Sequence, residues 1–177
     1  MINSTSTVSS AVTSPSPGRV TRLDALLGRS VEELEALYAE AEVPHLDAVR
    51  GDLRGRMLTT TVLSGRVADF ALRWASSRFF PWRGKSFTPK DASAGGGINR
   101  VVLDRFRLYR FETSIGRSKG GEFDALHLDY DLEDNPALIR AIADEIRELA
   151  PGLWLGQAYL RIGRQPVLML YFGLTSK

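Results

Sequence analysis

The chain has 177 residues, a formal net charge of +2 and no cysteine. This length suits one domain with a short tail, and the lack of cysteine excludes disulfides, thiolate catalysis and cysteine-ligated zinc or iron–sulfur centres. A charge this small, mixed along the chain, argues against a dedicated nucleic-acid-binding protein. The apolar content of 44% is near the globular average, so a sizeable core is available.

Residues 1–18 are rich in Ser and Thr and carry no charged side chain. Such a segment cannot bury enough apolar surface to offset its ordering entropy, so we expect a disordered tail followed by a single ligand-binding domain over 19–177. The segment also lacks the basic start and apolar centre of a secretory signal. No apolar run in the chain approaches the ~20 residues that span a bilayer. These features predict a cytoplasmic protein without a membrane partner.

Helical patterns dominate the first part of the domain. Val20 to Leu27 fits a short helical turn that Gly28 ends. Ser30 and Glu33 then have the spacing of a capping box, so a helix is expected from residue 31 to the residues before Pro44.

An extended segment and a second helix are expected next. Residues 51–63 read as a strand, and an interior glycine at position 55 suggests a bulge or bend. Apolar side chains then recur at helical spacing over 64–80, at Val67, Phe70, Ala71 and Trp74. Pro81 ends this second helix.

From Trp82 onward the pattern is mainly that of strands. We expect them at 82–88, 97–104, 105–115, 122–132, 152–162 and 166–174. Residues 116–121 form a hairpin loop in this interpretation, and residues 163–164 a tight turn. A late helix is predicted over 135–149, because Leu138, Ile142, Ile146 and Leu149 lie on one helical face.

These elements predict an α+β domain, mainly antiparallel β. A long antiparallel sheet can remove its edges by curling into a small closed or highly curved barrel, with the N-terminal helices and the late helix packed on it. The alternative is an α+β cone, a strongly bent sheet with the early helices across its open side. Either architecture leaves a concave, partly apolar pocket that suits a hydrophobic small-molecule ligand.

The hairpin of 105–115 and 122–132 carries the candidate catalytic residues. If its loop is centred near Ser118, Arg110 faces His127 and Leu108 faces Asp129. His127 beside Asp129 could then act as an acid or base, and Arg110 could hold a developing oxyanion. The residues of this face that would contact a ligand are Phe106, Leu108 and Glu112. The alternative is that the charged face is a solvated side of the sheet.

Three further residues are candidates for the pocket lining, namely Trp82, Gln157 and Tyr159. Gln157 and Tyr159 share one face of their strand, where the neighbouring Gly156 can let a ligand approach the backbone. Trp154, between Leu153 and Leu155, is expected in the core.

Metal and phosphate motifs are weak. His45 and His127 occur in neither an HxH nor an HExxH pattern, so we expect no metal and no cofactor. The run Gly95-Gly96-Gly97 is followed by a strand pattern and not by the helix that a phosphate loop requires. We therefore expect it to be a flexible loop near the pocket mouth.

Two segments have a familiar form. Gly51-Asp52-Leu53-Arg54-Gly55, followed at a distance by Trp82-Arg83-Gly84-Lys85-Ser86-Phe87, resembles the bacterial GXWXG-type proteins. In those proteins a G-x-W-x-G strand precedes a W-x-G-K-x-F strand, and Leu53 here replaces the expected tryptophan. The resemblance implies a lipocalin-like, or calycin-like, barrel with an apolar lumen, and it implies no catalytic residue.

Two main hypotheses for function follow. The first is a cofactor-independent isomerase or cyclase that acts on a hydrophobic small molecule in the barrel lumen, as in bacterial specialised metabolism. The second is a carrier or sensor with the same pocket and no turnover, which needs no titratable group in its lumen. A nucleic-acid-binding module is a third, less favoured hypothesis. The sequence leaves the oligomeric state open, a homodimer included.

Overall fold

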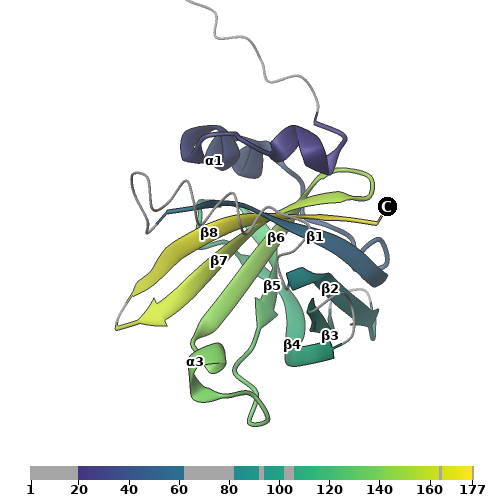
Figure 1. Cartoon of the computed structure of the whole chain (residues 1–177), viewed down its shortest axis with the longest axis vertical. Coiled ribbons are helices and arrows are strands. Elements are labelled where there is room, and N and C mark those ends of the chain that lie inside the picture. The colour runs from purple at the N-terminus through teal and green to yellow at the C-terminus, as the bar shows by residue number, and fades with distance from the viewer. Residues whose placement is uncertain (1–19, 62–81, 92–93, 102–105, 164, 177) are drawn as a thin grey trace, which may run out of the picture.

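The computed structural model describes residues 20–61, 82–91, 94–101, 106–163 and 165–176. Within them, eight antiparallel strands close into one barrel, in which each strand pairs with its neighbour in the chain and β8 pairs back to β1 (Figure 1). The strands are β1 Gly51–Thr60, β2 Trp82–Pro89, β3 Ala94–Val101, β4 Phe106–Arg117, β5 Asp124–Asp129, β6 Ile142–Ala150, β7 Leu153–Ile162 and β8 Gln165–Thr175. The predicted small antiparallel barrel is confirmed, and the open cone is excluded.

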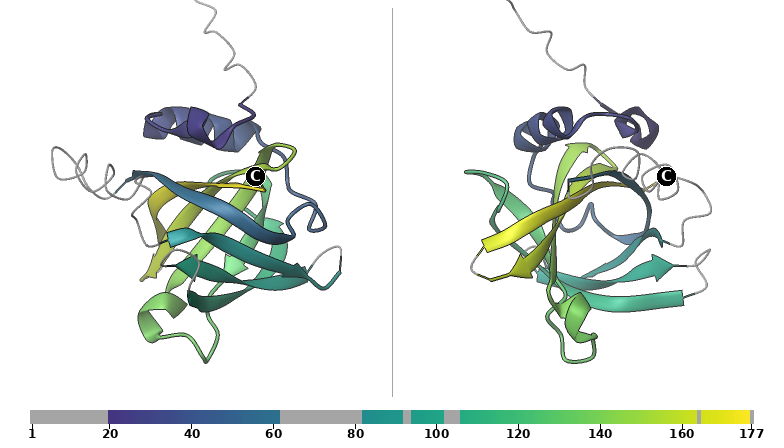
Figure 2. Two further views of the ribbon diagram at one scale, coloured as in Figure 1. Left: turned by 45° about the vertical axis from the view of Figure 1, so that its right-hand side comes forward. Right: turned by 60° about the vertical axis from the view of Figure 1, so that its left-hand side comes forward.

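Two short helical elements precede the barrel and lie together along one side of it (Figures 1 and 2). They are the 3₁₀ turn η1 (Leu23–Leu26) and the helix α1 (Val31–Glu40). The Glu33 amide donates to Ser30 Oγ at 3.2 Å, and the Ser30 amide donates to the Glu33 carboxylate at 2.9 Å. The predicted capping box is therefore present. None of the helices in the described ranges has the length and hydropathy that crossing a membrane requires.

Apolar side chains form two clusters, one inside the barrel and one outside it. The inner cluster draws on strands all round the barrel, with Leu53, Phe87, Phe111, Leu126, Leu128, Ile146, Trp154 and Phe172 among its members. The outer cluster joins η1 and α1 to the outer faces of β1, β7 and β8, through residues such as Leu26, Leu37, Leu58, Leu155 and Tyr171. Trp154 is fully buried, as the sequence predicts.

The prediction of a late helix over 135–149 is wrong. Only Ala137–Arg140 is helical, as α3, and residues 142–150 are strand β6. The side chains of Asp144 and Ile146 point inward on β6, whereas Glu145 and Arg147 lie on the outer side. Ala, Glu, Arg and Leu favour a helix in isolation, but β6 pairs with both β5 and β7 and thereby closes the barrel.

The prediction that Gly95-Gly96-Gly97 forms a flexible loop is also wrong, because these residues are part of β3. Gly97 pairs with Phe111, and a Cβ added at Gly97 would lie 2.3 Å from the Phe111 ring and 2.4 Å from the Ser86 carbonyl oxygen. The missing side chain therefore makes room for Phe111 inside the barrel.

Two further expectations concern segments outside the described residues. These are the disordered tail over 1–18 and the second helix over 64–80. The predicted strands are otherwise found, with ends that differ by a few residues, and β6 adds the strand that the sequence did not predict.

Candidate functional site

Four of the polar side chains that point into the barrel lie together among apolar neighbours. They are Lys85 on β2, Asn99 on β3, Tyr130 just after β5 and Asp144 on β6. Their exposed fractions are only 3%, 8%, 2% and 5% respectively. A buried lysine and aspartate are rare unless they are paired, and these four residues, the lumen cluster, form the candidate site.

The lumen cluster is held by a closed set of hydrogen bonds. Lys85 Nζ donates to Asp144 Oδ2 at 2.8 Å and to Asn99 Oδ1 at 2.9 Å, and it also bonds the Tyr130 hydroxyl. Tyr130 in turn donates to Asp144 Oδ2 at 3.0 Å. The Asn99 amide nitrogen donates to the Tyr130 hydroxyl at 3.1 Å. Direct hydrogen bonds therefore link the three titratable groups Lys85, Tyr130 and Asp144.

Aromatic rings surround the ammonium group of Lys85. Its nitrogen lies 5.5 Å from the ring centroids of Trp82 and Phe111, and 5.2 Å from those of Tyr130 and Phe172. Trp82 also donates its indole N–H to Asn99 Oδ1 at 3.1 Å. The ring faces partly replace the water that the lysine loses on burial.

Burial changes the proton affinities of two members of the cluster. Desolvation lowers the pKa of Lys85, although the adjacent Asp144 carboxylate opposes this shift. Desolvation and the Asp144 charge raise the pKa of Tyr130 well above its usual range, against the hydrogen bond from Asn99. Lys85 therefore gives up its proton more readily than an exposed lysine, whereas Tyr130 stays protonated and remains a donor.

One acceptor of the cluster has no partner. Asp144 Oδ1 is buried and makes no hydrogen bond to the described residues, although Oδ2 of the same carboxylate accepts two. An unsatisfied buried carboxylate oxygen is costly, and a hydroxyl or amide of a bound molecule would satisfy it.

Exposed apolar side chains occupy the inner face of the barrel at the end nearest this cluster. Strand pairing places Leu108 opposite Asn99 and Phe106 opposite Val101, so both point to the side of the sheet that Asn99 faces. Val167 is opposite Leu160, two residues along β7 from the inward Ala158. Phe106, Leu108 and Val167 are 53%, 42% and 45% exposed, and we call them the apolar rim.

The other end of the barrel is filled. Leu46 and Val49, from the loop that leads into β1, are buried in the same cluster as the inner residues Leu53, Trp154 and Leu174. The apolar rim, the lumen cluster and these packed residues therefore follow one another along the inside of the barrel. Such an arrangement suits a molecule with an apolar body and one polar end.

The predicted catalytic group is not assembled. Ser114, and not Arg110, lies opposite His127, and Arg110 is exposed and opposite Ile98. The hairpin loop comprises residues 118–123, because Arg117 pairs with Asp124. Its centre lies two residues beyond the expected position, which moves the partner of His127 by four residues. This even shift keeps Arg110, Glu112 and His127 on one face, whereas an irregularity in the pairing of β3 with β4 between Ile98 and Asn99 turns Phe106 and Leu108 to the opposite face.

His127 nevertheless lies outside the barrel. Leu126 and Leu128 fill the interior, so the alternation of β5 turns His127 to the outer surface. There the ring lies 3.3 Å from Glu145, and the loop after β4 covers this carboxylate completely. Ser118 Oγ and Lys119 Nζ each donate to Glu145 at 2.7 Å. This outer cluster fastens the loop to β6.

Asp129 and Glu112 are also on the outer surface. They are opposite each other across β4 and β5, and both are exposed. Asp129 accepts a hydrogen bond from Arg161 at 2.7 Å. Burial alone would raise the pKa of Asp129, but the hydrogen bonds from Arg161 and from the Asp131 amide outweigh it and lower that pKa. Neither residue can contact a molecule in the lumen.

The other predicted lining residues divide into two groups. Trp82, Phe106 and Leu108 belong to the lumen or its rim. Gln157 and Tyr159 are buried on the outer face, where the Tyr159 hydroxyl donates to Gln157 Oε1 at 2.7 Å and Gln157 donates to the Tyr171 hydroxyl at 3.0 Å. The loop of residues 118–123 rests on them, because a Cβ added at Gly120 would lie 2.6 Å from Gln157 Oε1.

Sequence reasoning missed all four members of the lumen cluster. A signal was present for Lys85, because strict alternation puts it on the face of Phe87, which is apolar. Tyr130 shares a face of its strand with Leu126 and Leu128. Asp144 had no such signal, since its segment reads as a helix. Among the described residues, no group of three or more histidine, aspartate and glutamate side chains could hold a metal ion.

Comparison with known proteins supports the fold alone. No protein-family model matches the chain, and no curated protein matches it. Among solved structures, a protein from Thermomonospora curvata is similar, with a TM-score of 0.52 and 16% sequence identity. The match covers 87% of this chain and 92% of that one. At this identity the similarity concerns the course of the backbone, and the chain is similar to that protein in its barrel architecture.

Proposed function

We propose that this protein is a cofactor-independent enzyme of the isomerase or cyclase class, and that a hydrophobic small molecule binds in its calycin-like barrel. The observation that carries the proposal is the buried Lys85–Tyr130–Asp144 cluster below an exposed apolar rim. A carrier needs apolar surface only, whereas this lumen contains three coupled titratable groups. The resemblance to the GXWXG-type proteins also predicts an apolar lumen.

The ligand would enter at the rim. Its apolar body would contact Phe106, Leu108 and Val167, and its polar end would replace part of the hydrogen bonding around Lys85. A carbonyl oxygen could accept from Lys85 or Tyr130, and a hydroxyl could donate to the unpartnered Asp144 Oδ1. Binding of this kind orients the reacting carbons against the lysine.

The chemistry would be the movement of a proton between two carbons. A proton passed from Lys85 to the Asp144 carboxylate leaves a neutral amine, which can remove a proton from the carbon next to the carbonyl. Tyr130, kept protonated by its raised pKa, donates to the oxygen of the resulting enolate. Return of the proton to a different carbon completes an isomerisation, so neither a cofactor nor a second substrate is consumed.

One observation favours the second candidate, a carrier without turnover. The four cluster side chains are 2–8% exposed and already bond one another, so a ligand could contact the rim and leave the cluster intact. Binding and proton transfer therefore have to be measured separately.

The test uses 2-decanone, a ketone with a long apolar chain, as the probe. Its binding is measured by calorimetry, and its proton transfer by mass-spectrometric deuterium uptake next to the carbonyl in D₂O. The proposal predicts saturable binding and enzyme-dependent deuterium uptake in the wild type, with uptake reduced at least 10-fold in Lys85→Met. Tyr130→Phe should retain binding and lose part of the uptake.

The matched control is Lys90→Met, which removes an exposed lysine from the turn after β2 and should leave both measurements unchanged. Circular dichroism verifies that each variant is folded. Saturable binding without deuterium uptake would favour the carrier and overturn the enzyme proposal. Absence of binding would overturn both.

A further inference from the structure

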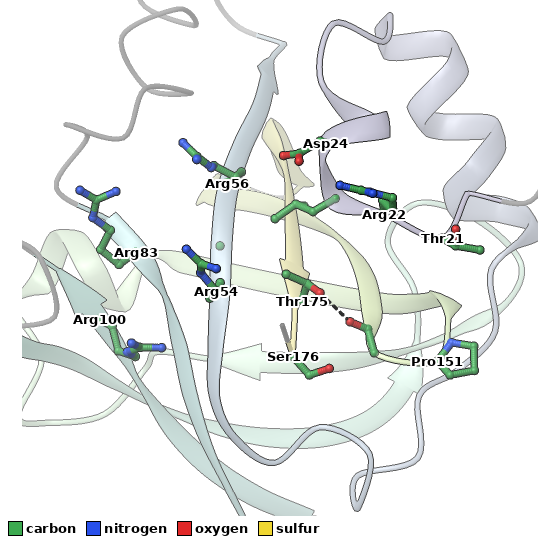
Figure 3. A pocket seen from close by; sticks show the side chains of 13 residues that line it. Thr21, Arg22, Asp24, Arg54, Arg56, Arg83, Arg100, Pro151, Thr175 and Ser176 are labelled. Carbon is green, nitrogen blue, oxygen red and sulfur yellow. Dashed lines mark hydrogen bonds between the residues drawn. The ribbon is translucent and has the colours of Figure 1, made fainter.

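A second hollow lies on the outer surface of the barrel, apart from the lumen. It is formed by η1, the middle of β1, β2 and β3, the turn between β6 and β7, and the end of β8 (Figure 3). Its volume is about 770 Å³, which is within the usual range for a small-molecule site. This hollow has no role in the proposed lumen chemistry.

Arginines dominate its lining. Five of them come from four separate elements or their flanks: Arg22, Arg54, Arg56, Arg83 and Arg100. Asp24 is the acidic residue among the described lining residues, and Asp52 lies beside Arg100 with an Nε–Oδ2 distance of 3.8 Å. Among the described lining residues, positively charged side chains therefore outnumber negatively charged ones.

The backbone of the barrel places two of these arginines side by side. Arg54 and Arg100 both pair with Gly84, from opposite sides of β2. Because Gly84 has no side chain, the Arg100 guanidinium can cross β2 and donate to the Leu53 carbonyl oxygen at 3.4 Å. A Cβ at Gly84 would lie 2.0 Å from that same oxygen, so no other residue fits here without a shift of the backbone.

β1 adds another arginine to the same surface. A Cβ at Gly55 would lie 2.4 Å from the Trp82 ring, so position 55 faces inward and its neighbours Arg54 and Arg56 face outward. On the other side of β1, Thr175 is opposite Arg54 and Gly173 is opposite Arg56. Leu23 of η1 fills the space above Gly173, which brings Arg22 and Asp24 to the border of the hollow.

From this arrangement we infer that the outer hollow binds a small molecule bearing phosphate groups. Several guanidinium groups gathered in one hollow repel one another, and a multiply charged anion relieves that repulsion. The planar fork of a guanidinium also matches two phosphate oxygens at once. A monovalent anion would neutralise too little of this charge, so the ligand should carry at least two negative charges.

Pyrophosphate is the probe, titrated into the full-length protein by calorimetry at constant ionic strength. We expect one pyrophosphate per chain and weaker binding of inorganic phosphate. Arg54→Gln should weaken pyrophosphate binding at least 10-fold. The matched control is Arg117→Gln, which removes the same charge from the end of β4, where Arg117 is exposed and pairs with Glu122. Both substituted side chains are exposed, so both variants should fold.

Three results would overturn the inference. The first is absence of pyrophosphate binding at millimolar concentration. The second is equal weakening in Arg54→Gln and Arg117→Gln, which would mean attraction by overall charge. The third is tighter binding of a single-stranded oligonucleotide than of pyrophosphate, which would identify a nucleic-acid surface. Because the hollow and the lumen share no residue, this test and that of the proposed enzyme can fail independently.

Discussion

At the scale of single residues, the ion pair between Lys85 and Asp144 dominates the interior. Asp144→Ala would leave the Lys85 ammonium, which is only 3% exposed, without its anionic partner. We expect a loss of about 3–5 kcal/mol in the free energy of unfolding, because an uncompensated buried charge remains. Urea unfolding followed by fluorescence measures this loss.

An exposed ion pair provides the control for that variant. Asp131 pairs with Arg140 at 2.7 Å, and both side chains are 43–50% exposed. Asp131→Ala should therefore cost less than about 1 kcal/mol. Similar small losses for Asp131→Ala and Asp144→Ala would show that the Lys85 pair is not buried as described here.

The lowered pKa of Asp129 predicts a specific dependence of stability on acid. A carboxyl group whose pKa falls on folding stabilises the protein at pH values above its pKa in the unfolded chain, which is about 3.9. That contribution disappears as the pH falls through the lower folded value. The side chain is 54% exposed, so the contribution at pH 7 should be below about 1 kcal/mol.

Thermal unfolding of the wild type and Asp129→Asn from pH 7 to pH 2 checks this prediction. The wild type should be the more stable protein at pH 7, and the two curves should converge below pH ~4. A gap that widens in acid would have the wrong sign and would contradict the arrangement of Arg161 around Asp129.

Residue identity could predict part of the site. The predicted lining residues Trp82, Phe106 and Leu108 lie at the lumen or its rim, although Phe106 and Leu108 were predicted to share a face with His127. His127 and Arg110 were chosen for their intrinsic chemistry, yet the packing of Leu126 and Leu128 decides which way His127 points. Intrinsic chemistry identifies groups that can react, whereas burial decides which of them meet a ligand.

At the scale of elements, the missing side chains of β3 control how tightly the barrel packs. Gly97→Ala would place a methyl group against the Phe111 ring and the Ser86 carbonyl oxygen. Overpacking of this kind should cost roughly 1–3 kcal/mol. Gly116→Ala is the control, because its Cβ would lie 3.2 Å from the His127 ring on the outer face. Thermal unfolding of both variants should show the larger loss for Gly97→Ala, and a neutral Gly97→Ala would contradict the described packing.

β6 shows why one element could not be predicted. Ile142 and Ile146 are four residues apart, a spacing that fits one helical face, but both positions also fall on one face of a strand. The charged residues between them favour solvent in either structure. Only the pairing of β6 with β5 and β7, and the burial of Asp144 against Lys85, make the strand the better solution. These contacts are distant in sequence, so local propensity does not contain them.

The hairpin between β4 and β5 shows a related limit. Its glycines at 116, 120 and 121 locate a turn, but several loop lengths fit such a run. The buried carboxylate of Glu145 selects the observed loop, since it accepts hydrogen bonds from Ser118 and Lys119. Glu145 was assigned to a helix, so this constraint on the register was absent from the prediction.

At the scale of the whole molecule, the two faces of the barrel have different roles. The inner face packs an apolar core around the lumen cluster, and the outer face supports η1, α1 and the arginine hollow. The closed antiparallel barrel was predictable, because short hairpins and alternating strands leave few other ways to remove the sheet edges. Which face of each strand points into the barrel was not predictable, because this depends on which apolar face the helices cover.

A ligand bound in the lumen is proposed to contact the Lys85 cluster directly. The Trp82 indole N–H donates to Asn99 within that cluster, so its NMR signal reports on the lumen, and the His127 ring reports on the outer surface. The most direct measurement is a titration with 2-decanone that follows both signals, with Trp82→Phe to assign the indole. The account predicts a saturable shift of the Trp82 signal and a constant His127 signal. A constant Trp82 signal with a shifting His127 signal would contradict it.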